Sequence, residues 1–171
     1  SATKKELKIG VASFLSLYRN DRSNRAYCFC AGDCRLGLLK NNSIQWISPV
    51  HTGANPMGNG FENSMYLAPE RHILTKSLNL RRNFEPEAFE LETSCEDVFV
   101  IATDGFWMAL NEVQQQSFIN EPEAYKEGKY LVDDTSVLLV TWSALESEFD
   151  YDLSIELRSP LKQLTTQKND N

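Results

Sequence analysis

An apolar run that ends directly at an Asp-Gly pair is the feature that most limits how this chain can fold. The run lies within FVIATDGFWMAL, positions 99–110. A short apolar run of this kind is typical of a strand that is buried on both faces. The sequence therefore predicts a strand over 97–103 and places a carboxylate, Asp104, at its end.

Two β-hairpins are predicted in the first third of the chain. Residues 8–18 and 25–31 are rich in aromatic and β-branched residues and are separated by the polar cluster RNDRSN. Residues 36–40 and 43–47 flank the pair Asn41-Asn42, which suits the positive φ angles of a tight hairpin turn. Each pair of segments is therefore expected to form antiparallel strands.

A helix is predicted after the buried strand, over 105–118. Its apolar residues recur at helical spacing, and its glutamines fill the outer face. The apolar set is Phe106, Ala109, Leu110, Val113 and Phe118. The other expected elements are an irregular loop over 52–70, an alternating strand at 87–92, a short helix at 121–128, a buried strand at 135–142 and an edge strand at 153–157.

Composition indicates one globular domain. The 171 residues are 42% hydrophobic and 11% aromatic, which is enough for a real core. No apolar run approaches the ~20 residues of a membrane span, and the start of the chain lacks the apolar stretch of a signal peptide. The net charge of −7 argues against a nonspecific nucleic-acid binder. We therefore expect a cytoplasmic protein with neither nucleic acid nor membrane as partner.

The cysteines allow two interpretations. They stand at positions 28, 30, 34 and 95. A zinc site would use Cys28, Cys30 and Cys34 with His51 or His72, but their spacing is not that of a usual zinc knuckle. Because Cys28 and Cys30 alternate with larger residues as strand residues do, buried free thiols in a reducing compartment are the favoured interpretation.

Three acids stand at the ends of expected strands. Asp104 follows one buried strand, Asp133 precedes another, and Asp33 lies in the AGDCR turn. If these carboxylates converge at one rim of the sheets, they would repel one another unless a hard cation such as Mg²⁺ or Mn²⁺ neutralised them. Taken singly, each is better explained as a turn residue or a helix N-cap.

Three segments resemble motifs of the metal-dependent protein phosphatases, the PPM or type 2C family, and they occur in the family's order. AGDCRLGLL resembles its G-D-S-R turn, ATDGFWMAL its S-D-G-x-W element, and VDDTSVLLV its closing D-N-x-T-x-x-V strand. NNSIQWISPVHTGANP also resembles the family's run through an S-P-D-H segment. The resemblance covers about residues 9–142 and is closest to the bacterial members.

The resemblance implies an α+β fold, a β-sandwich of two mainly antiparallel sheets flanked by helices. Residues 1–143 would form the phosphatase-like domain, and 144–171 a C-terminal extension with one edge strand and a flexible tail. Asp104 would bridge two Mn²⁺ or Mg²⁺ ions, Asp133 would ligate one of them, and Asp33 would help to hold a third. Gly105, the fourth member of the implied metal site, would let the chain pass close to the ions.

The implied activity is hydrolysis of phosphoserine or phosphothreonine on proteins by a metal-activated water. No catalytic residue beyond the metal ligands is implied. His51 and His72 are expected to be structural or solvent-facing rather than catalytic. Arg35 could meet a phosphate, but the acidic composition favours pairing with a nearby carboxylate.

Residues 1–30 contain neither the R-x-x-x-E-D nor the D-G-H-G motif of the family's N-terminal third. The resemblance therefore implies an N-terminally incomplete fold, completed by a second segment or another chain. Met108 also stands where many members have an acid. An alternative function is thus a catalytically inactive, phosphatase-like binding or regulatory module, and a third possibility is an unrelated sandwich whose acids are turn residues.

Overall fold

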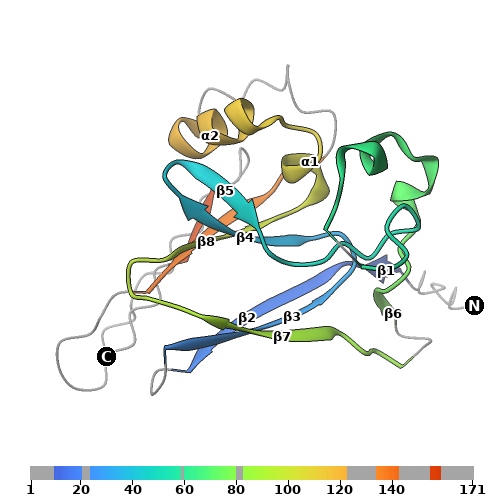
Figure 1. Ribbon diagram of the computed structural model, residues 1–171, viewed down its shortest axis with the longest axis horizontal. Helices are drawn as coiled ribbons and strands as arrows, with labels where there is room; N and C mark the ends of the chain where they lie inside the picture. The colour runs from blue at the N-terminus through green and yellow to red at the C-terminus, as the bar shows by residue number, and fades with distance from the viewer. Residues whose placement is uncertain are drawn as a thin grey trace, which may run out of the picture.

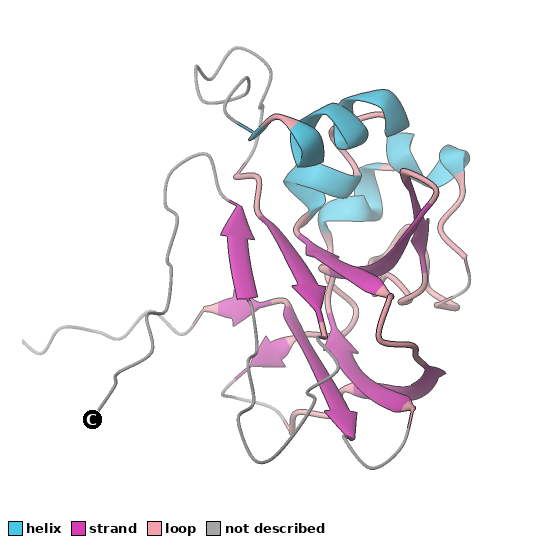
Figure 2. Ribbon diagram, turned by 90° about the vertical axis from the view of Figure 1, so that its left-hand side faces the viewer, coloured by secondary structure: helices cyan, strands magenta, loops and turns pink. Residues whose placement is uncertain are grey.

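Two antiparallel sheets stacked face to face form the body of the molecule (Figure 1). The structure is a computed structural model, and it describes residues 10–20, 24–58, 60–79, 83–122, 134–142 and 155–158. Short helices gather over the outer face of the larger sheet (Figure 2). The predicted α+β sandwich with flanking helices is confirmed.

The larger sheet has five strands in the order β10-β9-β8-β4-β5. These strands are β4 (Arg35–Lys40), β5 (Ser43–Trp46), β8 (Val98–Ala102), β9 (Val137–Thr141) and β10 (Ile155–Arg158). The predicted hairpin at Asn41-Asn42 is confirmed, because both residues have positive φ angles, 50° and 66°. The buried strands expected at 97–103 and 135–142 form β8 and β9. The edge strand expected at 153–157 forms β10, which pairs with β9.

The smaller sheet has three strands in the order β2-β3-β7. They are β2 (Phe14–Asn20), β3 (Arg25–Ala31) and β7 (Glu87–Glu92). The expected single strand over 8–18 is wrong in one respect: the chain breaks at Ser13, and β1 (Val11–Ala12) pairs instead with β6 (Leu78–Asn79). Ser13, between the two strands, forms hydrogen bonds with Asp33. Residues 8 and 9 lie outside the described part.

The space between the two sheets is filled by one apolar cluster. Its buried members come from β3, β4, β8 and β9, and half-buried residues from β2 and β7 pack against them. The buried members are Cys28, Cys30, Leu36, Phe99 and Val140. Cys28 and Cys30 are therefore free thiols that fill the core, as the favoured interpretation expected.

The helical layer consists of α1 (Asp104–Trp107) and α2 (Glu112–Asn120). The single helix expected over 105–118 is thus wrong, because Asn111 and Gln114 form a capping box that starts a new helix. The expected faces also change. Val113 is 73% exposed, whereas Gln115 is buried and donates to the carbonyls of Trp107 and Leu110.

The segment 52–70, expected to be irregular, contains two short 3₁₀ helices. They are η1 (Asn63–Leu67) and η2 (Pro69–His72), and they lie beside α1 (Figure 1). Phe61 and Tyr66 pack edge-on against Trp107 of α1. The loop therefore lies over the aromatic part of the outer core. Most of the helix expected at 121–128 lies outside the described residues.

Candidate functional site

Strand pairing brings three of the motifs to one rim of the five-stranded sheet. Arg35 of β4 pairs with Ala102 of β8, and Ala102 pairs with Val137 of β9. These residues are the first of β4, the last of β8 and the first of β9. Asp33 and Asp104 therefore both lie just beyond the same row of strand ends, where the segment that contains Asp134 also arrives.

The turn that contains Asp33 is held from two sides. Ser13 accepts a hydrogen bond from the Asp33 backbone N–H at 3.1 Å, and its hydroxyl donates to the Asp33 carboxylate. Trp107 Nε1 of α1 donates to the Asp33 carbonyl at 2.8 Å. The carboxylate is half-buried. The turn is thus fixed against both β2 and the helix that begins at the second acid.

Asp104 and Gly105 begin α1 and lie against the segment that leads into β9. A Cβ atom added to Gly105 would stand 2.5 Å from the Asp134 carbonyl oxygen, so only glycine allows this approach. Thr135 Oγ1 donates to the Gly105 carbonyl at 2.9 Å, and Thr103 Oγ1 donates to the Asp134 carbonyl at 3.2 Å. Hydrogen bonds therefore connect the segment that begins α1 to the segment that leads into β9.

The thiol of Cys34 shows that Asp33 and Asp104 share one electrostatic environment. Burial, followed by the negative charges of Asp33 and Asp104, raises the pKa of Cys34 to about 11. Both carboxylates thus act on one thiol. Cys34, the residue that takes the serine position of the family motif, is therefore influenced by two of the predicted metal ligands.

The full metal set is not seen within the described residues. Asp133 lies outside them, and elsewhere in the described ranges no three His, Cys, Asp or Glu side chains are grouped closely enough to hold a metal ion. Two carboxylates at one rim, with a backbone carbonyl close by, have the donor chemistry of a site for a hard cation. The roles of Asp33, Asp104, Asp133 and Gly105 as metal ligands remain predictions.

Arg35 differs from its expected role. It is 6% exposed and stacks on two indole rings, with its Cζ 5.1 Å from the Trp46 ring centroid and 4.8 Å from that of Trp107. No ion pair with a carboxylate is found for it in the described part of the chain. The expected pairing with a nearby acid is therefore wrong. The sequence did not predict that Trp46 and Trp107 stack on Arg35, because only the folding of the chain brings these distant residues together.

The two histidines have different environments. His72 is exposed at the end of η2. His51 is buried, and its Nε2 lies 3.0 Å from Glu87 Oε2 of β7. The His51 backbone N–H donates to the Gly32 carbonyl at 2.9 Å, next to Asp33. These contacts agree with the expectation that His51 has a structural role.

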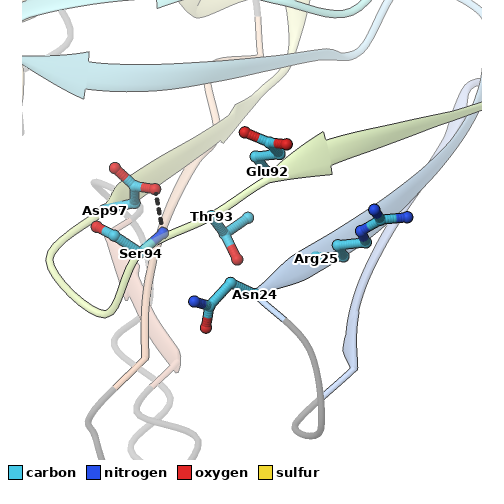
Figure 3. Close-up of a pocket in the computed structure, with 6 residues that line it drawn as sticks. All are labelled: Asn24, Arg25, Glu92, Thr93, Ser94 and Asp97. Atoms are coloured by element: carbon cyan, nitrogen blue, oxygen red, sulfur yellow. Dashed lines mark hydrogen bonds between the residues drawn. The ribbon is translucent and has the colours of Figure 1, made fainter.

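A separate polar pocket lies at the turn between β7 and β8. Figure 1 shows that this turn is at the opposite end of β8 from α1. It has a volume of about 480 Å³, and Figure 3 shows the six polar residues around it. They are Asn24, Arg25, Glu92, Thr93, Ser94 and Asp97. Asp97 accepts a hydrogen bond from the Ser94 N–H at 2.7 Å, which stabilises the turn between β7 and β8. None of the motif acids lines this pocket.

Solved structures with a similar fold include bacterial serine/threonine phosphatases. The Mycobacterium tuberculosis phosphatase PstP/Ppp matches with a TM-score of 0.60 and 16% identity over 77% of this chain and 60% of its own. The Mycobacterium smegmatis PPM Ser-Thr phosphatase MsPP, in complex with cacodylate, matches with 0.60 and 18% over 74% and 60%. The catalytic domain of PstP in complex with two manganese ions matches with 0.50 and 17% over 74% and 56%.

These likenesses show the fold, and the predicted PPM phosphatase-like sandwich is confirmed at that level. The chain spans about 60% of the length of the solved phosphatases that it matches. No protein-family model matches the chain, and no curated protein matches it. Among the described residues, no helix combines the length and the apolarity needed to cross a bilayer.

Proposed function

From the fold that this chain shares with bacterial PPM-type phosphatases, we propose that it is a metal-dependent phosphatase, or part of one, acting on phosphoserine and phosphothreonine in cytoplasmic proteins. The observation that carries the proposal is the strand register Arg35–Ala102–Val137, which brings Asp33 and Asp104 to one rim. In an unrelated sandwich these acids would be turn residues and would bind no metal ion, which is the outcome that the experiment below separates from the proposal.

The proposed cofactors are two or three Mn²⁺ or Mg²⁺ ions. Asp33, Asp104 and Asp133 would supply carboxylate oxygens, which are the ligands that hard cations prefer. The manganese complex of the PstP catalytic domain, a protein of the same fold, supports this choice. When bound, such ions would lower the pKa of a water and neutralise charge on the phosphoryl group.

The contribution of the chain itself is to hold these acids in place before substrate arrives. Ser13 and Trp107 fix the turn of Asp33, as described above. Gly105 allows the segment of Asp134 to lie directly against the start of α1. Because ligands that are fixed beforehand need no rearrangement on binding, this bracing favours a defined arrangement of carboxylates.

Asp104→Asn tests the proposal directly. In the full-length protein we expect manganese-dependent hydrolysis of p-nitrophenyl phosphate and of a phosphothreonine peptide, reduced about 100-fold or more in this variant because a central carboxylate is lost. Asp97→Asn is the matched control. It removes an acid at the opposite end of β8, and it should retain wild-type rates. Full activity in Asp104→Asn would exclude the proposed metal chemistry.

A catalytically inactive binding or regulatory module is the second candidate. The surroundings of Met108 favour it, because Arg71 Nη1 of η2 donates to the Met108 sulfur one helical turn after Asp104. A thioether beside a guanidinium is a poor environment for a further cation. Titration calorimetry with Mn²⁺ separates the candidates: an inactive module that holds no ions releases no heat, whereas the proposed enzyme binds the metal.

A further inference from the structure

The guanidinium group of Arg35 is buried but has no hydrogen-bond acceptor. Its Nε atom is sealed from solvent without a partner, and no hydrogen bond from its other nitrogens is found in the described part of the chain. A buried charge of this kind costs free energy unless it is paired. Of the other arginines, Arg25 shows the usual solution, an exposed ion pair with Glu90 at 2.8 Å.

The surroundings hold the guanidinium in place without neutralising it. Trp46 comes from β5 and Trp107 from α1, and the guanidinium carbon lies about 5 Å from each indole centroid. Cation–π contacts stabilise a planar cation but leave its in-plane N–H groups available. A guanidinium group is protonated at neutral pH, so Arg35 brings a full positive charge to this place.

We infer that Arg35, held between Trp46 and Trp107, is an oxyanion-binding subsite that accepts a phosphate group beside the acidic rim. This inference rests on the proposed function for its ligand class. A planar guanidinium offers parallel N–H donors to two oxygens of a phosphate. The phosphate has two sources, the phosphoryl group of a bound substrate or the free phosphate released from it.

Tryptophan fluorescence can report on this subsite directly. Trp142 packs on Phe99 in the inter-sheet core, so Trp142→Phe leaves only the two indoles that enclose Arg35. With a chelator present to remove divalent ions, inorganic phosphate is titrated into the full-length Trp142→Phe protein. We expect a saturable change in emission, because the bound anion alters the charge between the two rings.

Arg35→Met in that background should weaken the apparent affinity for phosphate by about tenfold or more, since it removes a charge-assisted pair. Arg19→Met in the same background is the matched control, because Arg19 of β2 also has a buried Nε without a hydrogen-bond partner among the described residues. In the wild-type protein Arg19 lies over Trp142 at 5.4 Å, and that ring is a phenylalanine in both variants. Arg19→Met should not change the response. An unchanged response in Arg35→Met, or no saturable response in the parent protein, would overturn the inference.

Arg35→Lys is a second variant, which keeps the test valid if Arg35→Met does not fold. It keeps the charge but loses the parallel donors, so we expect intermediate affinity with an unchanged circular dichroism spectrum. Equal affinity in Arg35→Lys and the parent protein would also contradict the subsite. Because phosphate binding is measured without metal or turnover, failure of the proposed hydrolysis and failure of this subsite are separate results.

Kinetics distinguish the two sources of phosphate. If the subsite holds the substrate's phosphoryl group, Arg35→Met raises KM for a phosphothreonine peptide more than it lowers kcat. If it holds the released product, KM stays unchanged and inhibition by inorganic phosphate weakens. A variant that changes neither quantity would show that the subsite takes no part in the reaction and would overturn its assignment.

Discussion

At the residue scale, the candidate site depends on how closely two backbone segments approach at Gly105. The Asp134 carbonyl occupies the space that any side chain at this position would need. Thr135 and Thr103 then bond across the same contact. A protein interior has little free volume to accept an extra methyl group. Even the smallest side chain should therefore force the two segments apart.

Gly105→Ala should destabilise the protein by about 1–3 kcal/mol, because its methyl group would collide with backbone rather than with a movable side chain. Urea unfolding followed by circular dichroism measures the change. Gly60→Ala is the control, since nothing lies within 4 Å of the added Cβ there, and it should stay within about 0.5 kcal/mol of wild type. Similar losses at both positions would contradict the close approach.

Single residues also show where sequence reasoning reached its limit. The position of Asp104 at the end of a buried strand was predictable from local pattern alone. The stacking of Arg35 was not, because Trp46 and Trp107 are 61 positions apart in the chain and meet it only through strand pairing and helix packing. The expectation that Arg35 pairs with a carboxylate came from the acidic composition of the chain, and it named the wrong partner.

At the scale of elements, the break between α1 and α2 keeps the start of α1 near the rim. Asn111 begins α2 through a capping box in which its side chain accepts from the Gln114 N–H at 3.0 Å. Gln115 then reaches back to the Trp107 carbonyl at 3.1 Å. Trp107 in turn donates to the turn of Asp33. The two helices and the acid-bearing turn are therefore one connected unit.

Asn111→Ala should lower the free energy of unfolding by about 1 kcal/mol, because it removes one half of the capping box. Thermal or urea unfolding gives the value. Asn120→Ala makes the same substitution at the exposed end of the same helix, where no cap is lost, so its effect should be near zero. If Asn120→Ala costs as much as Asn111→Ala, the capping assignment is wrong.

Elements with a local signal were predictable, and those that depend on distant contacts were not. The hairpin at Asn41-Asn42 and the alternation in β7 follow from neighbouring residues alone. The spacing of Asn111 and Gln114 is that of a capping box and indicates a helix start. Apolar residues recur at helical spacing on both sides of this point, so the sequence was interpreted as one longer helix. The break at Ser13 had no local sign in the sequence, and the residue that bonds to Ser13 there is Asp33, 20 residues later.

At the scale of the whole molecule, His51 connects the segment that follows β5 of the larger sheet to the smaller sheet. Its ring contacts Glu87 at the start of β7, while its backbone bonds to Gly32, directly after β3. Lys76 also approaches the Glu87 carboxylate, at 3.5 Å. The hydrogen bond from His51, followed by the charges of His51 and Lys76, holds the pKa of Glu87 below its ordinary value.

The lowered pKa of Glu87 gives this link a defined pH dependence. Its contribution to stability is present above the ordinary carboxyl pKa of 4.5 and is lost as the pH falls through the lowered native value. Because the Glu87 side chain is 42% exposed, Glu87→Gln should cost under about 1 kcal/mol at neutral pH. Urea unfolding from pH 7 to pH 3 should show this difference shrinking. Glu85→Gln, an exposed acid nearby, should show no such trend, and a constant cost for Glu87→Gln would refute the linkage.

The pairing of β4 with β8 also restricts how the length of this chain can vary. Side chains alternate between the two faces of a sheet, so one residue inserted within either strand would turn Arg35 or Phe99 toward the wrong layer. It would also displace one acid along the rim by about 3.3 Å relative to the other. Natural insertions and deletions should consequently accumulate in the segment between β5 and β7, where added length leaves the register of β4 and β8 unchanged.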